Sequence, residues 1–266
     1  MTTAGVDVGS LTSKAVILED GKVRSSSLIF TGPEGRAAGE RALAIALERA
    51  GLGHDRLECT VATGYGRIFL PFADANLTEI SCHARGAHWH FPGVRTILDM
   101  GGQDCKAIRC DESGNVAEFA MNDKCAAGVG RFVEVIAELL EVGLADVGPL
   151  SLSTVSTQAS ISSTCVLFAK SEVLALLRRG ARRSDILGGV CEALAGRVHG
   201  LLAKVGIEPE LVVSGGIAQN AGVVRRVAEK TGLEPRIPPD PQLVGALGAA
   251  LLAQERLRGR AGPKEA

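Results

Sequence analysis

The sequence has few aromatic side chains and almost no net charge. Of its 266 residues only seven are Phe, one is Trp and one is Tyr, whereas 33 are Gly. Such a composition provides few platforms on which the bases of a single-stranded nucleic acid can stack. The 29 basic and 30 acidic side chains give a formal charge of −1, which provides no broad attraction to nucleic acid or to an anionic membrane. We therefore expect neither of these as a partner.

The sequence also lacks targeting signals. The N-terminus MTTAGVDVGS has neither the basic segment nor the apolar core of a secretory signal, and no later apolar run approaches membrane-spanning length. We therefore expect a cytoplasmic protein, with 46% hydrophobic residues to build its core. In a reducing compartment seven cysteines are not expected to form a disulfide framework. Each is then a packing residue, a reactive thiol or a metal ligand.

Glycine-containing turns separate short apolar runs, and the pattern of runs occurs twice. Runs at 4–8, 13–18 and 23–29 predict a three-stranded antiparallel meander. A helix over 34–50 with Gly51 as its C-cap and a strand at 57–63 follow. The second meander is predicted at 96–100, 106–110 and 116–121, and the later elements are helices at 131–142, 166–178 and 184–205, a strand at 210–214, a helix near 217 and a last helix at 243–257. The sequence is therefore typical of an α/β protein, and the tail 258–266 is expected to be flexible.

One short motif recurs with the meander. The pattern Asp-x-Gly-(Ser/Gly)-x-x-x-Lys-Ala begins at Asp7 and again at Asp99. Each copy spans a strand, a Gly turn and a second strand, so the sequence predicts two duplicated lobes with equivalent turns across a cleft. The alternative is a chance likeness between two unrelated hairpin turns.

These turns have the composition of phosphate-binding loops, because Gly and Ser expose backbone N–H groups and a hydroxyl. Asp7 and Asp99 are predicted to face the phosphates through Mg²⁺, since a carboxylate cannot approach a polyphosphate unaided. A strand-Gly-Gly-helix junction at 212–220 fits an adenosine contact, although by itself it is also typical of a packed turn. The predicted catalytic residues are Asp7, Asp99 and Gln103, and the predicted nucleotide-binding residues are Gly9, Ser10, Leu11, Thr12, Lys14, Gly101, Gly102, Gly215, Gly216, Ile217 and Asn220.

Two phosphate loops followed by an adenosine loop resemble the actin, sugar kinase and heat-shock chaperone superfamily. The resemblance implies an actin-like ATPase fold, with ribonuclease H-like lobes at 1–94 and 95–242 around a nucleotide cleft and the last helix packed back on the first lobe. It does not identify the reaction, because the superfamily includes kinases. A small-metabolite kinase and a non-enzymatic ATP-dependent sensor or scaffold therefore stay open.

Two cysteines, Cys125 and Cys165, are predicted to lie at the starts of helices. The helix dipole favours thiolate there, which is the form that ligates iron. A 4Fe-4S cluster takes four thiolates and the sequence has no C-x-x-C, so one chain offers half a site that a C2 dimer could complete. The alternative, equal in weight, is that both thiols pack as small hydrophobes.

The remaining cysteines and the histidines near residue 85 are expected to be structural. A rival metal site of Cys82, His83, His88 and His90 is less favoured than core and surface histidines. We expect packing roles for Cys59, Cys105, Cys110 and Cys191.

Six segments together resemble one family, the activators of 2-hydroxyacyl-CoA dehydratases, which are related to the ATPase subunits of benzoyl-CoA reductase. The segments are NDKCAAGVGRF, ISSTCVLFAKSEV, VATGYGR, LDMGGQD, SGGIAQN and GALGAAL, and the likeness covers nearly the whole chain. It implies a homodimer that binds ATP/ADP and Mg²⁺ and holds one bridging 4Fe-4S cluster through Cys125 and Cys165 of each subunit. It also implies that ATP hydrolysis drives an electron from a reduced ferredoxin or flavodoxin to the dehydratase. A benzoyl-CoA reductase or a double-cubane cluster protein is the alternative acceptor.

Overall fold

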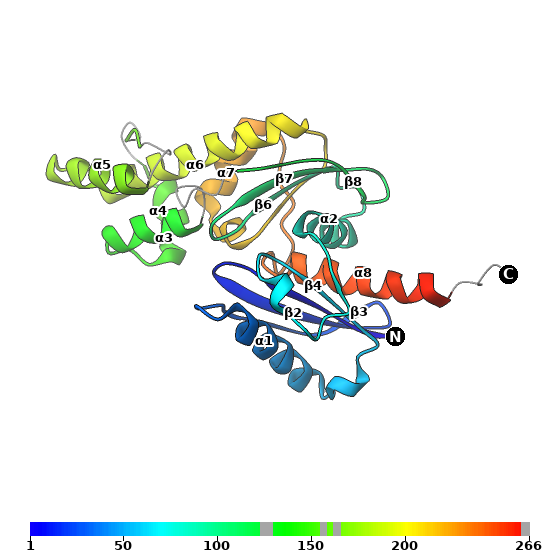
Figure 1. The fold of residues 1–266 in the computed structure, drawn as a ribbon. Coiled ribbons are helices and arrows are strands. Elements are labelled where there is room, and N and C mark those ends of the chain that lie inside the picture. Colours follow the sequence, from blue (N-terminus) through cyan, green and yellow to red (C-terminus); the bar gives the residue numbers. More distant parts are fainter. Residues whose placement is uncertain (123–129, 155–158, 162–165, 262–266) are drawn as a thin grey trace. The chain divides into compact units, whose positions relative to one another are not determined.

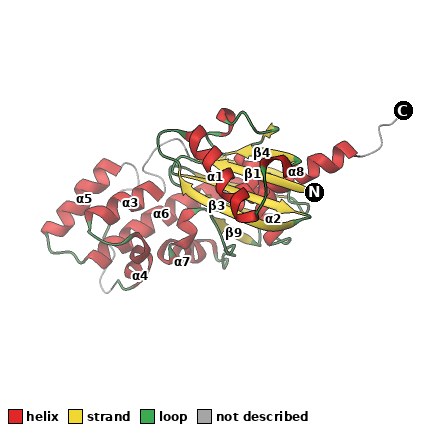
Figure 2. Ribbon diagram, turned by 90° about the horizontal axis from the view of Figure 1, so that it is seen from below, coloured by secondary structure: helices red, strands yellow, loops and turns green. Residues whose placement is uncertain are grey.

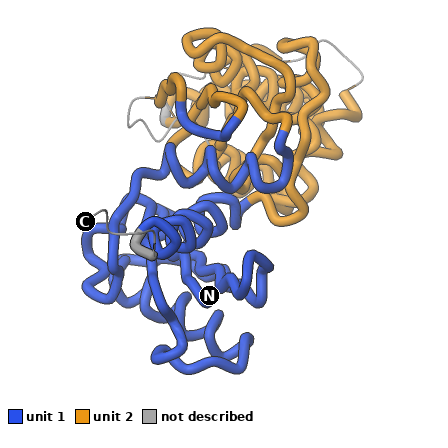
Figure 3. Tube along the Cα trace, turned by 90° about the vertical axis from the view of Figure 1, so that its right-hand side faces the viewer, with its two compact units in different colours: residues 1–92, 113–116, 242–266 blue, residues 93–112, 117–241 orange. Residues whose placement is uncertain are grey.

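A computed structural model describes residues 1–122, 130–154, 159–161 and 166–261. The chain forms two compact units (Figure 3). Unit 1 comprises residues 1–92, 113–116 and 242–266, and unit 2 comprises residues 93–112 and 117–241. The lobe boundaries predicted from the sequence, 1–94 and 95–242, stay a proposal about domains.

Unit 1 is built on a five-stranded sheet with the order β3-β2-β1-β4-β5 (Figure 1). The strands are β1 (Thr2–Val8), β2 (Thr12–Glu19), β3 (Lys22–Phe30), β4 (Cys59–Thr63) and β5 (Ala75–Asn76). Strands β1, β2 and β3 pair antiparallel, which confirms the predicted meander. Strand β4 runs parallel to β1, and a parallel pair needs a crossover, which includes α1 (Gly35–Ala50). Helix α1 ends at Gly51 in the left-handed conformation, as predicted.

Helices cover both faces of this sheet (Figure 1), because alternate residues of β1 point to opposite sides. Ala4 and Val6 pack against α1 in one core cluster. Gly5 points the other way, where a Cβ would collide with the backbone of α8 (Val244–Ala261). Helix α2 (Glu79–His90), which was not among the predicted helices, lies against α8 so closely that Gly248 leaves no room for a side chain.

The second sheet repeats this arrangement. Its order is β8-β7-β6-β9, formed by β6 (Thr96–Met100), β7 (Cys105–Cys110), β8 (Val116–Met121) and β9 (Leu211–Ser214). Strand β6 pairs antiparallel with β7 and parallel with β9. The order matches β3-β2-β1-β4 of unit 1, so the duplication includes the parallel strand as well as the hairpin.

The helices of unit 2 group beside its sheet (Figure 2). They are α3 (Gly130–Leu139), α4 (Val147–Leu152), α5 (Val166–Arg178), α6 (Arg183–Val205) and α7 (Ala221–Thr231). The sequence reading missed α4, and it placed the start of α7 too early, because a 3-10 turn at Gly216–Gln219 precedes that helix. One core cluster joins these helices to β6, β7 and β9.

Helix α6 corrects one expectation, that no apolar run approaches membrane-spanning length. Within the described part of the chain it is the one helix that meets the length and composition of a membrane span. However, 61% of the apolar window is buried inside the protein. Ile186, Leu194 and Val198 belong to the unit 2 core, so α6 has the burial of a core helix.

Candidate functional site

The turns that follow β1 and β6 share one hydrogen-bonding pattern. In unit 1 the backbone N–H of Gly9 donates to the carbonyl of Thr12 at 3.0 Å, and in unit 2 Gly101 donates to Asp104 at 3.0 Å. Both turns close antiparallel hairpins in equivalent register, since Asp7 lies opposite Lys14 and Asp99 lies opposite Lys106. The shared geometry favours duplication over a chance likeness between the two motifs.

Each turn holds a buried Asp–Lys pair. Lys14 Nζ donates to Asp7 Oδ2 at 3.1 Å, and Lys106 Nζ donates to Asp99 Oδ2 at 3.3 Å. Asp7 is 6% exposed and Asp99 only 2%. Because a buried charge is costly unless it is paired and hydrogen-bonded, each lysine compensates its aspartate and fixes the direction of the carboxylate.

A glycine turn packs on each aspartate from the parallel strand. Thr63 lies beside Asp7 in the β1–β4 register, and Ser214 lies beside Asp99 in the β6–β9 register. The next residues, Gly64 with φ +87° and Gly215 with φ +84°, have backbone angles that favour glycine. We missed Gly64 in the sequence, although the matching Thr-Gly and Ser-Gly pairs at the ends of the two parallel strands were a usable signal.

A Cβ at either glycine would meet the aspartate. At Gly64 it would lie 2.5 Å from the carbonyl oxygen of Val8 and closer still to Asp7 Oδ1. At Gly215 it would lie 2.9 Å from Asp99 Oδ1. The two glycines therefore allow the backbone to approach each carboxylate closely.

Apart from its lysine, each aspartate has different surroundings in the two units. Ser214 Oγ donates to Asp99 Oδ1 at 3.0 Å, whereas the equivalent Thr63 Oγ1 donates to the carbonyl of Leu77 at 3.1 Å. Asp7 instead adjoins the first turn of α8, where a Cβ at Gly245 would lie 3.3 Å from Asp7 Oδ2. The positive end of the helix dipole favours a carboxylate there. Gly245 belongs to the GALGAAL segment, but the sequence did not show that this segment reaches Asp7.

The third predicted catalytic residue, Gln103, and the other predicted nucleotide-binding residues occupy varied positions. Half-buried turn residues are Gly9, Ser10, Leu11, Thr12, Gly101 and Gly102, whereas Gln103 and Gly216 are exposed. Ile217 is buried in the unit 2 core, and Asn220 caps α7 by accepting a hydrogen bond from the N–H of Val223 at 3.1 Å. The structure thus gives Ile217 a packing role and Asn220 a capping role, and their contribution to nucleotide binding stays a prediction.

The five described cysteines are buried in the protein, which confirms packing roles for Cys59, Cys105, Cys110 and Cys191. Burial also raises thiol pKa values, to about 12 for Cys82 and about 11 for Cys110. It raises the pKa of Cys105 and Cys191 as well. Protonated thiols are poor metal ligands, so these side chains are unsuited to iron.

The predicted cluster ligands Cys125 and Cys165 lie outside the described residues. Over the ranges that are described, no group of three or more His, Cys, Asp or Glu side chains is arranged to hold a metal ion. His83, from the rival metal site, is buried in α2 next to Gly245.

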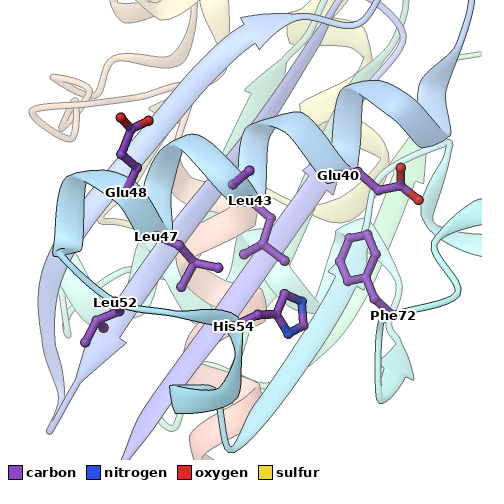
Figure 4. Close-up of a pocket in the computed structure, with 8 residues that line it drawn as sticks. Glu40, Leu43, Leu47, Glu48, Leu52, His54 and Phe72 are labelled. Atoms are coloured by element: carbon purple, nitrogen blue, oxygen red, sulfur yellow. The ribbon is translucent and has the colours of Figure 1, made fainter.

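Unit 1 also has a hollow of about 380 Å³ beside α1 (Figure 4). Its apolar lining is Leu43, Ala44, Leu47, Leu52 and Phe72, and its polar lining is Glu40, Glu48 and His54. None of the residues predicted to bind nucleotide lines this hollow.

Comparisons with known proteins cover the whole length of the chain. The model of the BadF/BadG/BcrA/BcrD ATPase family matches residues 4–253. The activator of lactoyl-CoA dehydratase from Anaerotignum propionicum is 48% identical over 255 residues, covering 96% of this chain and 98% of the relative. Component A of the (R)-2-hydroxyglutaryl-CoA dehydratase from Acidaminococcus fermentans has a crystal structure that superposes with a TM-score of 0.92, at 43% identity over 97% of this chain and 99% of its own. The structure of the activator of the 2-hydroxyisocaproyl-CoA dehydratase from Clostridium difficile, solved with bound ADPNP, has a TM-score of 0.91 at 41% identity, and the match covers 100% of this chain and 99% of its own.

More distant structures show the fold alone. The ethanolamine utilization protein EutJ from Carboxydothermus hydrogenoformans has a TM-score of 0.61 at 14% identity, covering 94% of this chain and 90% of its own. A ROK family glucokinase from Streptomyces griseus has a TM-score of 0.58 at 14% identity, covering 96% of this chain and 100% of its own. The actin-like ATPase fold predicted from the sequence is therefore confirmed.

Proposed function

The chain belongs to the BadF/BadG/BcrA/BcrD ATPase family, and on that premise we propose that it activates a 2-hydroxyacyl-CoA dehydratase by ATP-driven transfer of one electron. The observation that carries the proposal is the full-length likeness to dehydratase activators. The likeness to a sugar kinase concerns the fold alone, so a small-metabolite kinase is not favoured.

The two duplicated turns would bind ATP and then ADP. The N–H groups of Gly9 and Gly101 close the turns, so the residues that follow them, Ser10 and Gly102, are the ones proposed to offer backbone N–H groups to phosphate oxygens, and Lys14 adds a positive charge at the first turn. Asp7 and Asp99 would hold Mg²⁺ directly or through water, and the bound ion would neutralise phosphate charge. Each carboxylate is an oxygen donor of the kind that Mg²⁺ prefers, and its direction is fixed by its lysine. Gln103, exposed on the second turn, would contact the nucleotide or the attacking water.

Cys125 and Cys165 would hold the iron-sulfur cluster. The raised pKa values of Cys82, Cys105, Cys110 and Cys191 support this choice, because four of the other five thiols are held in the protonated form. Two ligands per chain are half of the four that a 4Fe-4S cluster takes, so a C2 homodimer would share one cluster. When bound, the cluster would supply the single electron that the acceptor receives.

We propose a cytoplasmic location and partners that follow from the same chemistry. A reduced ferredoxin or flavodoxin would donate the electron, and a 2-hydroxyacyl-CoA dehydratase would accept it. A benzoyl-CoA reductase or a double-cubane cluster protein is the alternative acceptor, because this chain would use the same nucleotide turns and thiolates to deliver an electron to it.

The proposal is tested by anaerobic activation of a 2-hydroxyacyl-CoA dehydratase. We expect 2-enoyl-CoA to form only when this protein, Mg-ATP and a low-potential reductant are all present, and not when a non-hydrolysable ATP analogue replaces ATP. Full dehydratase activity without ATP would contradict the proposal. Phosphorylation of an alcohol substrate by an iron-free preparation would support the kinase alternative instead.

A further inference from the structure

The two Asp–Lys pairs differ because one of the lysines has a second carboxylate partner. In unit 2, Lys106 Nζ donates to Asp104 Oδ1 at 3.0 Å in addition to Asp99 Oδ2. Asp104 stands five residues after Asp99, and the residue five positions after Asp7 is Thr12. The first copy therefore has a hydroxyl where the second copy has a carboxylate, and Lys14 pairs with Asp7.

Burial separates the two lysines in the same way. The side chain of Lys106 is 2% exposed, whereas that of Lys14 is 12% exposed. An ammonium group has three N–H donors, and two of those of Lys106 are directed at carboxylates. Removing it from both would leave uncompensated charges in a buried site, which is strongly unfavourable. The ammonium group of Lys106 is therefore held by protein carboxylates, whereas the more exposed Lys14 is placed to contact a ligand.

Lys106 also connects Asp99 to the turn that carries Gln103. Its partner Asp104 accepts the N–H of Gly101 through its backbone carbonyl, the bond that closes the turn. Asp99 is held on its other oxygen by Ser214. One lysine thus links the carboxylate predicted to act on the nucleotide to the backbone around it.

We propose that Lys106 is a positioning residue, which together with Asp104 fixes the direction of Asp99, while the equivalent Lys14 contacts phosphate. The inference rests on the proposed function, because it requires that Asp99 acts on a bound nucleotide. Both units contain the Asp–Lys pair, but the position that is Thr12 in unit 1 is Asp104 in unit 2. This difference gives the two lysines different roles.

The matched variants Lys14→Met and Lys106→Met test this division. The measurements are the Kd for a fluorescent Mg-ADP analogue and the kcat of ATP hydrolysis by the full-length protein. We expect Lys14→Met to weaken nucleotide binding by about tenfold or more. Lys106→Met should change the Kd by less than about twofold and lower kcat by about tenfold or more, because it misaligns Asp99 and removes no contact with the bound nucleotide. The proposal is overturned if Lys106→Met weakens binding as much as Lys14→Met, or leaves kcat unchanged.

A second variant avoids the cost of leaving Asp99 without its counter-charge. Asp104→Asn keeps the size of the side chain at a position that is 34% exposed, and it replaces one carboxylate partner of Lys106 by a neutral amide. We expect kcat to fall by about threefold or more with an unchanged Kd, and the melting temperature to fall less than in Lys106→Met. An unchanged kcat would refute the proposal that Lys106 and Asp104 together fix the direction of Asp99. An absence of ATPase activity in the wild-type protein would contradict the proposed function, whereas an active wild type with unaffected variants would contradict this inference alone.

Discussion

Replacing Gly64 by Ala places a methyl group directly against Asp7. The φ of +87° at Gly64 costs about 1–2 kcal/mol for a residue with a Cβ. The new Cβ would also lie 2.5 Å from the carbonyl oxygen of Val8, so backbone or carboxylate must move. Overpacking of this kind costs about 1–3 kcal/mol, which gives a total of about 2–5 kcal/mol.

Gly51→Ala is the matched control in the same unit. Gly51 has φ +69° and no heavy atom within 4 Å of the Cβ position, so this variant has the backbone cost alone. In a protein of this size 1 kcal/mol shifts the melting temperature by about 2–4 °C. We expect Gly64→Ala to lower the melting temperature by about twice as much as Gly51→Ala or more.

Activity separates the two variants further. Misplacement of a reacting group by about 1 Å can lower a rate about 100-fold, so we expect Gly64→Ala to reduce kcat for ATP hydrolysis by at least about tenfold. Gly51→Ala should retain the wild-type kcat, because its site is at the end of α1. If the two variants have equal melting temperatures and equal rates, the close approach of Gly64 to Asp7 has no functional role and the reasoning is refuted.

Three further predictions follow from the described residues. Ser214→Ala should lower the free energy of unfolding by about 1.5–3 kcal/mol, because it removes a hydrogen bond to a carboxylate. Thr63→Ala should lower it by about 0.5–1.5 kcal/mol, because the lost hydrogen bond has a neutral acceptor. Equal losses of stability in urea unfolding would contradict this prediction. Burial raises the pKa of Cys82 from 9.0 to about 12 in the folded protein, so its contribution to stability is complete below pH 9 and is lost as pH rises toward 12. Between pH 8 and pH 10 the free energy of unfolding of the wild type should therefore fall by about 1.4 kcal/mol more than that of Cys82→Ala. An equal fall in both proteins would contradict this prediction. The Cys125→Ser/Cys165→Ser double variant should show no rapidly reacting thiol at pH 8 before denaturation, and a fast phase would contradict the burial of the remaining five.

Local sequence signals predicted the strands of both hairpins and the last helix well. The alternation of apolar residues predicted β1, β2 and β3, and Gly51 marked the end of α1, because these features depend on neighbours in the sequence. Helix α2 was missed for a physical reason. Its buried face consists largely of small residues such as Ala84, Gly86 and Ala87, which give a weak periodic signal, and Gly86 lies close to Gly248 of α8.

The geometry around Asp7 and Asp99 was predictable as far as the repeated motif extended. Each aspartate lies opposite its lysine because the spacing between the two residues repeats in the sequence. The contacts that hold them depend on pairing between distant segments. Ser214 is 115 positions from Asp99, and Gly245 reaches Asp7 from the other end of the chain. Sequence spacing carries no information about such contacts, so the roles of Ser214 and Gly245 required the structure, whereas the matching Thr-Gly and Ser-Gly pairs were a signal for Gly64.

Iron content of the anaerobically reconstituted dimer tests the central claim most directly. We expect about four iron atoms per wild-type dimer, since a 4Fe-4S cluster would be shared by two chains. Cys125→Ser and Cys165→Ser should each lose most of this iron while keeping the wild-type affinity for Mg-ADP. A full complement of iron in both variants, or an iron-free wild type, would contradict electron transfer through these two cysteines.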